Sequence, residues 1–184
     1  MSGTKQANAQ QEEEERKIEG KEAEETKMNE TRERIWSTSS NWIVITTNGM
    51  LNKQGNAIMG KGIALAAKTQ VKGCDVTLGK MIKRSGNHVY MFADYGATQK
   101  LISFPTKHDW RKPSDIELIK QSCQELLALW RKQDKKTKVS LPQVGCQNGG
   151  LDYDTTVKPI LMHYFATNET RPWFTVCLSN HSPS

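Results

Sequence analysis

Residues 55–62 form a glycine-rich turn, Gly-Asn-Ala-Ile-Met-Gly-Lys-Gly, that leads directly into an apolar, helix-forming stretch. In such a turn the main-chain N–H groups and the positive end of the helix converge on one spot and bind anions. As far as Lys61 the spacing matches the P-loop of nucleotide hydrolases, but Gly62 stands where Ser or Thr would hold magnesium. We therefore predict a site for a phosphate-bearing ligand that lacks the usual metal.

A second glycine cluster, Gly-Cys-Gln-Asn-Gly-Gly, occupies residues 145–150 and follows an apolar stretch near residue 141. Two such loops predict a diphosphate that is held from both sides. Each loop also has an alternative interpretation as an ordinary tight turn, because glycine pairs are common in turns. A P-loop NTPase is nearly excluded, because Gly62 replaces the magnesium ligand and no apolar strand ends in Asp.

The composition changes sharply near residue 35. We expect residues 1–34 to be a disordered charged tail, with a fraying helix as the alternative, and residues 35–184 to form one domain. The tail holds seven Lys and Arg against ten Glu, a net charge of −3, so that the total of +6 leaves +9 on the domain. A basic domain favours polyanionic ligands, including nucleotides and nucleic acid, although the same charge also serves solubility.

The four cysteines are scattered, with no Cys-x-x-Cys pair and no His at metal-binding spacing. We interpret them as reduced thiols of an intracellular, cytoplasmic protein, and we expect neither a metal nor a cofactor. No apolar run is long enough to span a bilayer, and no signal-peptide pattern is visible, so that no membrane partner is expected.

Strands and helices alternate along the sequence. Helices are expected from Gly62, from a capping box at Ser114–Glu117, and after a cap at Asp154. A hairpin is expected around residues 85–87. Pro105 is expected to end the strand at residues 101–104. The strands are expected at residues 42–47, 88–92, 101–104, 139–141 and 174–178.

This order predicts an α/β fold with a largely parallel sheet that is covered on both faces. Ligands of such sheets bind beyond the carboxyl ends of the strands. Three segments reach that edge, at residues 46–62, 104–111 and 142–152. Both glycine loops belong to these segments, which strengthens the prediction of a ligand site there.

Four motifs in this order resemble those of macro domains: Thr-Asn-Gly at 47–49, Ile-Met-Gly-Lys-Gly-Ile-Ala at 58–64, Phe-Pro-Thr-Lys at 104–107 and Leu-Pro-Gln-Val-Gly-Cys at 141–146. The chain is most similar to the branch that contains the DNA ADP-ribosyl glycohydrolase antitoxins and the terminal ADP-ribose protein glycohydrolases. The resemblance covers roughly residues 41–180. It implies a three-layer α/β/α sandwich, with a mixed and largely parallel sheet, that binds ADP-ribose.

The resemblance also implies roles for individual residues. Asn48 would contact the distal ribose, and Lys107 would be catalytic, either as a nucleophile at the anomeric carbon or as a charge that polarises the scissile linkage. Asp152, Trp110 and Arg111 are candidate accessory residues, and Asp152 has an alternative as a helix-start residue. The residues themselves show that Trp110 with Arg111 suits base stacking and phosphate pairing, and the alternative is a partly buried Trp110 with a solvated Arg111. The diphosphate and distal ribose would be held by Gly60, Lys61, Gly62, Ile63, Gly145, Cys146, Gln147, Asn148, Gly149 and Gly150.

Two departures from the macro-domain pattern stand out. The first strand of these domains usually ends in Gly-Asp, which recognises adenine, and no such pair precedes Trp42. Adenine recognition is therefore unassigned. The protein-directed relatives place an aspartate in the second glycine loop, where this chain has Gly149, which favours the DNA-directed branch.

The resemblance implies a hydrolase of the ADP-ribosyl glycohydrolase type that removes ADP-ribose from modified DNA or protein. Two alternatives stay open: a non-catalytic ADP-ribose-binding module and an ADP-ribose 1″-phosphate phosphatase. The expected partners are ADP-ribose or an ADP-ribosylated macromolecule, with single-stranded nucleic acid as a further candidate. We expect a monomer.

Overall fold

The computed structural model describes residues 3–25 and 27–179, and in these residues six strands form one sheet. The sheet has the order β1-β6-β5-β2-β4-β3, in which only the β3–β4 pair is antiparallel. The prediction of a mixed and largely parallel sheet is thus confirmed. The strands are β1 Asn29–Thr31, β2 Trp42–Asn48, β3 Met91–Tyr95, β4 Gln99–Lys107, β5 Val139–Leu141 and β6 Phe174–Cys177.

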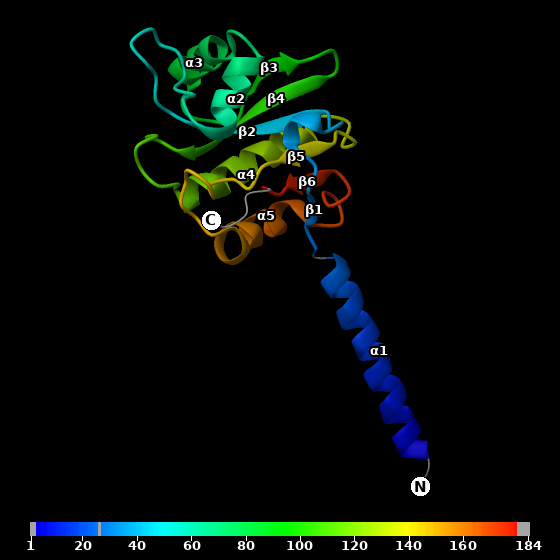
Figure 1. Cartoon of the computed structure of the whole chain (residues 1–184). Coiled ribbons are helices and arrows are strands. Elements are labelled where there is room, and N and C mark those ends of the chain that lie inside the picture. Colours follow the sequence, from blue (N-terminus) through cyan, green and yellow to red (C-terminus); the bar gives the residue numbers. More distant parts are fainter. Residues whose placement is uncertain (1–2, 26, 180–184) are drawn as a thin grey trace.

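Helices cover both faces of the sheet, which gives three layers (Figure 1). Helices α2 and α3 contribute buried residues to the core on one face, and α4 and α5 contribute to the core on the other. Helix α1 projects away from the sheet. The helices are α1 Gly3–Glu25, α2 Gly62–Gln70, α3 Cys74–Ser85, α4 Ile116–Arg131 and α5 Lys158–Phe165, with short helical turns η1 Ile35–Ser37 and η2 Tyr153–Val157.

The central strand β2 divides its side chains between the two cores. Trp42 and Val44 are buried against α4 and α5, whereas Ile43 and Ile45 are buried against α2 and α3. A strand that is apolar on both faces is expected only where helices cover both faces. The α4–α5 core contains stacked aromatic rings: the ring centres of Phe165 and Phe174 lie 4.4 Å apart. Among the described residues, no helix combines the length and the apolar character needed to cross a bilayer.

The structure corrects the expected hairpin at residues 85–87. This region is the end of α3, which stops where Gly86 adopts a positive φ of 94°. The next strand begins at Met91 rather than at residue 88. Pro105 also does not end β4, which continues to Lys107. Proline is tolerated there because β3 begins at Met91, opposite Ile102 of β4. Beyond that residue, β4 pairs only with β2.

Two expected helix caps are also corrected. Helix α4 is capped by Asp115, whose carboxylate accepts from the backbone N–H groups of Glu117 and Leu118. Ser114 therefore does not cap it. The helical segment after the second glycine loop is capped by Asp152, which accepts from the N–H of Thr155 at 2.8 Å, and not by Asp154. The alternative reading of Asp152 as a helix-start residue is confirmed.

The structure differs from the expected division of the chain at residue 34, because Asn29–Thr31 form an edge strand. This strand pairs with β6, and Met28 beside it is buried, with 5% of its surface exposed. Glu30 accepts hydrogen bonds from the Tyr153 hydroxyl at 2.8 Å and the Lys158 ammonium at 2.6 Å. Residues 3–25 form α1, the alternative noted for the tail, and the side chains of residues 6–18 are all exposed. Disorder of this segment in solution stays a prediction.

Two truncations test where the folded domain begins. Removal of residues 1–26 should change the melting temperature by less than about 2 °C, because the described side chains of α1 are exposed. Removal of residues 1–31 should lower it by about 10 °C, because the burial of Met28 and the bonds of Glu30 are lost. Differential scanning calorimetry measures both. Equal melting temperatures for the two truncated proteins would contradict a structural role for β1.

Candidate functional site

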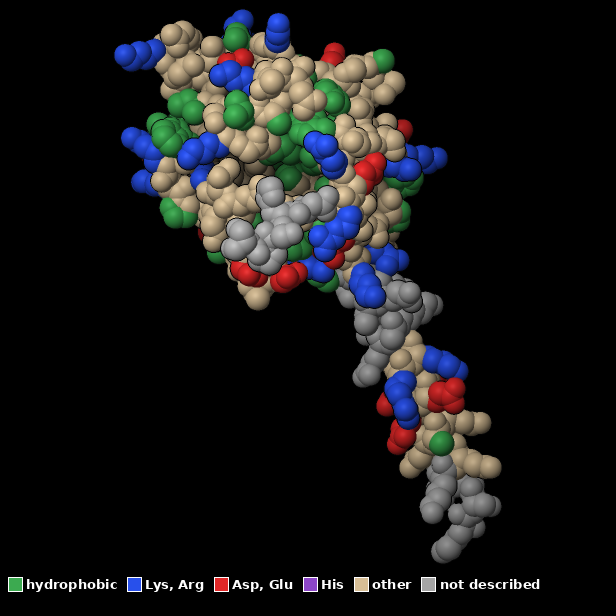
Figure 2. Space-filling view, viewed as in Figure 1, with side chains coloured by type: hydrophobic (Ala, Val, Ile, Leu, Met, Phe, Trp, Pro, Cys, Tyr) green, Lys and Arg blue, Asp and Glu red, His purple; other side chains and the backbone are tan. Residues whose placement is uncertain are grey.

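A pocket lies at the carboxyl edge of the central strands, and its lining includes residues at the ends of β2, β4 and β6 and residues that follow β5. Its volume is about 760 Å³, which lies in the range of sites for nucleotide-sized ligands. Figure 2 shows an apolar hollow with Lys and Arg side chains on both sides of it. The pocket is therefore suited to a ligand that has both apolar rings and negative charge.

The first glycine loop ends on one wall of this pocket. Helix α2 begins at Gly62 with no side chain capping its first turn, so that its leading N–H groups are available to a ligand. Gly62 has a positive φ of 57°, a conformation that a residue with a Cβ rarely adopts. The loop is fixed from behind by α3, because Ala57 donates its N–H to the Asp75 carbonyl at 3.0 Å.

The second glycine loop faces the first across the pocket. A methyl group on Gly62 would lie 3.1 Å from Nδ2 of Asn148, so that the loops are in near contact at this point. A methyl group on Gly149 would overlap Ser114 Oγ and the Gly145 carbonyl oxygen. This crowding explains why the second loop has no side chain at residue 149. Residues of the two glycine loops therefore line the same pocket, and their binding of a ligand stays a prediction.

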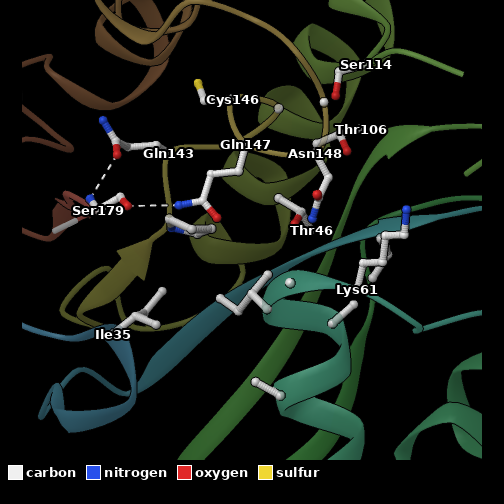
Figure 3. A pocket seen from close by; sticks show the side chains of 18 of the residues that line it. Ile35, Thr46, Lys61, Thr106, Ser114, Gln143, Cys146, Gln147, Asn148 and Ser179 are labelled. Carbon is white, nitrogen blue, oxygen red and sulfur yellow. Dashed lines mark hydrogen bonds between the residues drawn. The ribbon is translucent and has the colours of Figure 1, made fainter. Parts of the chain in front are cut away.

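A hydrogen-bonded chain fixes the wall beside the second loop. The Gln147 side chain donates to Ser179 Oγ at 2.9 Å, and the Ser179 N–H donates to Gln143 Oε1 at 2.9 Å (Figure 3). These bonds join the loop to the segment that follows β6. Figure 3 places Ile35 and Ser179 at one end of the pocket and Lys61 at the other. The pocket is thus elongated between two chemically different ends.

Lys107, the last residue of β4, joins the strand end to the second loop. Its Nζ donates to the Asn148 carbonyl at 2.9 Å and lies 3.5 Å from the Trp110 carbonyl. Lys107 and Asn148 both line the pocket. The strand end thus presents one amine to the cavity at the place where the two glycine loops approach each other.

Asn48 ends the neighbouring strand β2 and also lines the pocket. Its side chain donates to the Ile58 carbonyl at 3.0 Å and accepts from the Met50 N–H at 3.0 Å. Part of its amide is therefore engaged in shaping the first loop. One side-chain N–H remains for a ligand, since a carboxamide carries two.

Segment 108–112, which follows Lys107, forms the rim of the pocket. Trp110 lines the cavity and is 42% exposed, which is unusual for so large an apolar side chain. The Lys61 ammonium lies 5.9 Å from the centre of its ring. Arg111 forms two bonds with the Asp109 carboxylate, at 2.8 and 3.0 Å, and they hold the pKa of Asp109 down at about 2.

Most of the predicted site residues line the pocket, but three do not. Arg111 lies outside the lining on the rim, Asp152 is used as a helix cap, and Gly150 belongs to the loop without reaching the cavity. The sequence analysis missed one wall, at residues 33–36, and the end of β6 with the two residues after it, at 177–179. The wall was missed because it follows β1, which lies in a charged stretch without a strand pattern. The predicted residues in the lining are Asn48, Gly60, Lys61, Gly62, Ile63, Lys107, Trp110, Gly145, Cys146, Gln147, Asn148 and Gly149.

The Cys146 thiol is not an activated nucleophile. Burial raises its pKa to about 12, and the charges of Asp152 and Asp154 act in the same direction. A raised pKa leaves very little thiolate at neutral pH. Among the described residues there is also no group of His, Cys, Asp and Glu that could hold a metal ion. The polar groups of the pocket lining are instead the amines of Lys61 and Lys107, the charged side chains of Glu33 and Arg34, and several hydroxyls and neutral amides.

Sequence comparison relates part of the chain to curated proteins named DNA ADP-ribosyl glycohydrolase. It is 33% identical to those of Mycobacterium tuberculosis and Mycobacterium bovis over 108 residues, which is 53% of this chain and 29% of each relative. The protein of Thermus aquaticus is 31% identical over 108 residues, 52% of this chain and 28% of the relative. The chain spans less than a third of the length of these relatives. No protein-family model matches the chain.

Structure comparison relates nearly the whole described fold to macrodomains. A macrodomain of Mycobacterium tuberculosis DarG superposes with a TM-score of 0.66 at 25% identity, covering 86% of this chain and 99% of that chain. Thermosipho africanus DarTG, solved in complex with ADP-ribose, superposes with a TM-score of 0.69 at 20% identity. That match covers 86% of this chain and 44% of the other, and it shows the fold alone.

Cysteine alkylation tests the description of the second loop. At pH 8, Cys146 of the folded protein should resist iodoacetamide, because the pKa of about 12 leaves this thiol protonated. The thiolate fraction, and with it the rate of alkylation, should rise only as the pH approaches 12. In urea the residue should react readily. Mass spectrometry of peptides from both conditions measures this difference. Rapid labelling of Cys146 in the folded protein at pH 8 would be inconsistent with the buried thiol.

Proposed function

We propose that the chain, whose fold is similar to that of macrodomains, hydrolyses the bond between ADP-ribose and a modified macromolecule. One observation carries the proposal: Lys107 Nζ lies 2.9 Å from the Asn148 carbonyl, inside the pocket that the two glycine loops enclose. An amine in this pocket could act as a nucleophile at the sugar or stabilise charge on the leaving group. The similar proteins named DNA ADP-ribosyl glycohydrolase support DNA as the macromolecule.

The pocket suggests one orientation for ADP-ribose. The diphosphate would lie between the start of α2 and residues 145–149, where leading N–H groups face it from the first loop. The adenosine would extend towards the apolar wall that contains Ile35 and Trp36, at the end away from Lys61. The distal ribose would then face Asn48 and Lys107. This wall takes the place of the missing Gly-Asp pair as the proposed adenine site.

Lys107 has two chemical routes to bond cleavage. As a nucleophile, its amine forms a bond to the anomeric carbon while the bond to the target breaks, and the target leaves with the electron pair and takes a proton. Opening of the ribose ring converts this adduct to an imine between Lys107 and the sugar, and water then hydrolyses the imine to free ADP-ribose and the lysine. As an ammonium, it stabilises the negative charge that develops on the leaving group while water attacks. Both routes need the amine at the sugar, and they differ in whether a covalent intermediate forms.

Substitution of Lys107 tests its role. Lys107→Ala should lower kcat on ADP-ribosylated DNA by roughly a thousandfold, with a much smaller effect on the dissociation constant of ADP-ribose measured by calorimetry. Lys100→Ala, on the same strand but at its opposite end, is the matched control and should retain full activity. If Lys107→Ala cleaves at the normal rate, the proposal of lysine catalysis is wrong.

Two further measurements identify the route and the class. Lys107→Arg keeps the charge but loses the nucleophile, so that activity in this variant indicates the electrostatic route. Trapping of a sugar on Lys107 by borohydride indicates the covalent route.

Wild-type protein is also incubated with ADP-ribosylated protein and with ADP-ribose 1″-phosphate. Tight binding of ADP-ribose without turnover of any substrate would favour the binding module, and release of phosphate would favour the phosphatase.

Gly60→Ala tests the position of the diphosphate. In the free protein no heavy atom lies within 4 Å of a methyl group built at residue 60, and its backbone conformation does not require glycine. The melting temperature should therefore change by less than about 2 °C. The methyl group should nevertheless crowd a ligand that approaches the main chain, and ADP-ribose affinity should fall about tenfold. Lys53→Ala, in the same loop but outside the pocket lining, is the control. An unchanged ADP-ribose affinity in Gly60→Ala would contradict the proposed position of the diphosphate.

A further inference from the structure

Resting on the proposed function, we propose that Trp110, Lys61, Arg111 and Lys112 form a docking surface for a single-stranded nucleic acid, on which the nucleotide next to the modified one stacks. We name these four residues the rim surface. Trp110 and Lys61 line the pocket at its mouth, and Arg111 and Lys112 continue the surface beyond the pocket lining. The surface would select the form of the target, rather than the ADP-ribose itself.

The path of the target supports this location. The macromolecule stays attached to the distal ribose, which the proposed orientation places beside Lys107. The Trp110 carbonyl lies 3.5 Å from Lys107 Nζ, and Trp110 lines the cavity while 42% of its surface is exposed. A strand that leaves the pocket at Lys107 would therefore pass close to Trp110.

Trp110 has the exposure that stacking requires. It is 42% exposed, whereas Trp42 and Trp130 are buried in the core at 3% and 0%. The exposed part of this indole is apolar, and covering it with a partner would be favourable. Unpaired bases cover such rings well, and stacking of this kind is tolerant of sequence. Bases within a duplex are already stacked on one another, so that the surface favours a single strand.

The charges around the ring match a phosphate backbone. The Lys61 ammonium lies 5.9 Å from the Trp110 ring centre, and both Arg111 and Lys112 are exposed on the same short segment. Asp109, on the same segment, is paired with Arg111 through two hydrogen bonds. The Arg111 side chain is 63% exposed and has further N–H donors that Asp109 does not use, so that it can also bind a phosphate. An acidic peptide would also meet these cations, but it has no ring to stack on Trp110.

The test compares two substrates that carry the same modified nucleotide, one as a mononucleotide and one within a single-stranded nine-nucleotide DNA. The measured quantity is the ratio of kcat/KM for the strand to kcat/KM for the mononucleotide, because this ratio cancels any effect on the pocket itself. Trp110→Ala should lower the ratio about tenfold, and Trp110→Phe should keep most of it, because a phenyl ring still stacks. Replacing the strand by an annealed duplex should also lower it.

The salt dependence tests the charges independently. The double variant Arg111→Gln with Lys112→Gln should make the slope of log KM against log salt concentration for the strand shallower by about 1.4, as expected for two lost phosphate contacts on a single strand. Lys132→Gln with Lys136→Gln makes the same change of charge at the far end of α4 and should leave the slope unchanged.

Each outcome separates the rim surface from the proposed function. If wild-type protein cleaves both substrates and the rim variants keep the ratio and the slope, the rim surface is refuted while the hydrolase stands. If Trp110→Ala lowers kcat/KM equally for the strand and for an ADP-ribosylated acidic peptide, the rim surface is not specific for a nucleic acid and the proposal is refuted. If wild-type protein cleaves neither substrate, the hydrolase proposal fails. Fluorescence anisotropy with an unmodified nine-nucleotide strand then decides the rim surface, which requires weaker binding by Trp110→Ala and unchanged binding by Trp110→Phe.

Discussion

The contact between Lys107 Nζ and the Asn148 carbonyl is the interaction on which the site depends. It joins the end of a central strand to a loop that lies 41 residues further along the chain. The adjacent backbone repeats this connection, because Ser114 donates its N–H to the Gly149 carbonyl and Asp115 donates to the Thr106 carbonyl. Three bonds thus fix the strand end, the helix start and the second glycine loop relative to one another. An amine on a loop alone would not be held with this accuracy.

The arrangement of the site follows from the arrangement of the sheet. Parallel strands deliver their carboxyl ends to one edge, so that Asn48 and Lys107, which lie opposite each other in the β2–β4 register, reach the same pocket. The register shifts between Thr47 and Asn48, at the point where the strands leave the regular pairing. Irregular pairing of this kind often redirects side chains at functional sites.

Sequence patterns predicted the elements that carry their own signal. The strands at 42–48 and 139–141 are short apolar runs, and the two glycine loops are recognisable from their residues alone. Helix α3 was missed because it has Gly79 in its middle and begins after Gly73, which offers no side-chain cap. Strand β1 was missed because Asn-Glu-Thr has no strand pattern; its conformation is imposed by pairing with β6 and by the burial of Met28. One wall of the pocket depends on that tertiary contact, and hence could not be read from the local sequence.

The pairing of β1 with β6 has a consequence for the order of events during synthesis. The strand nearest the start of the chain pairs with the last strand, and Leu178 completes this connection by donating its N–H to the Thr31 carbonyl at 2.8 Å. Residues 33–36, which follow β1, and residues 177–179, at the end of β6, line the cavity. A nascent polypeptide that still has residue 174 inside the ribosome therefore lacks a finished binding site, however well its central layers have formed. Ligand capture should begin only after the final strand has emerged.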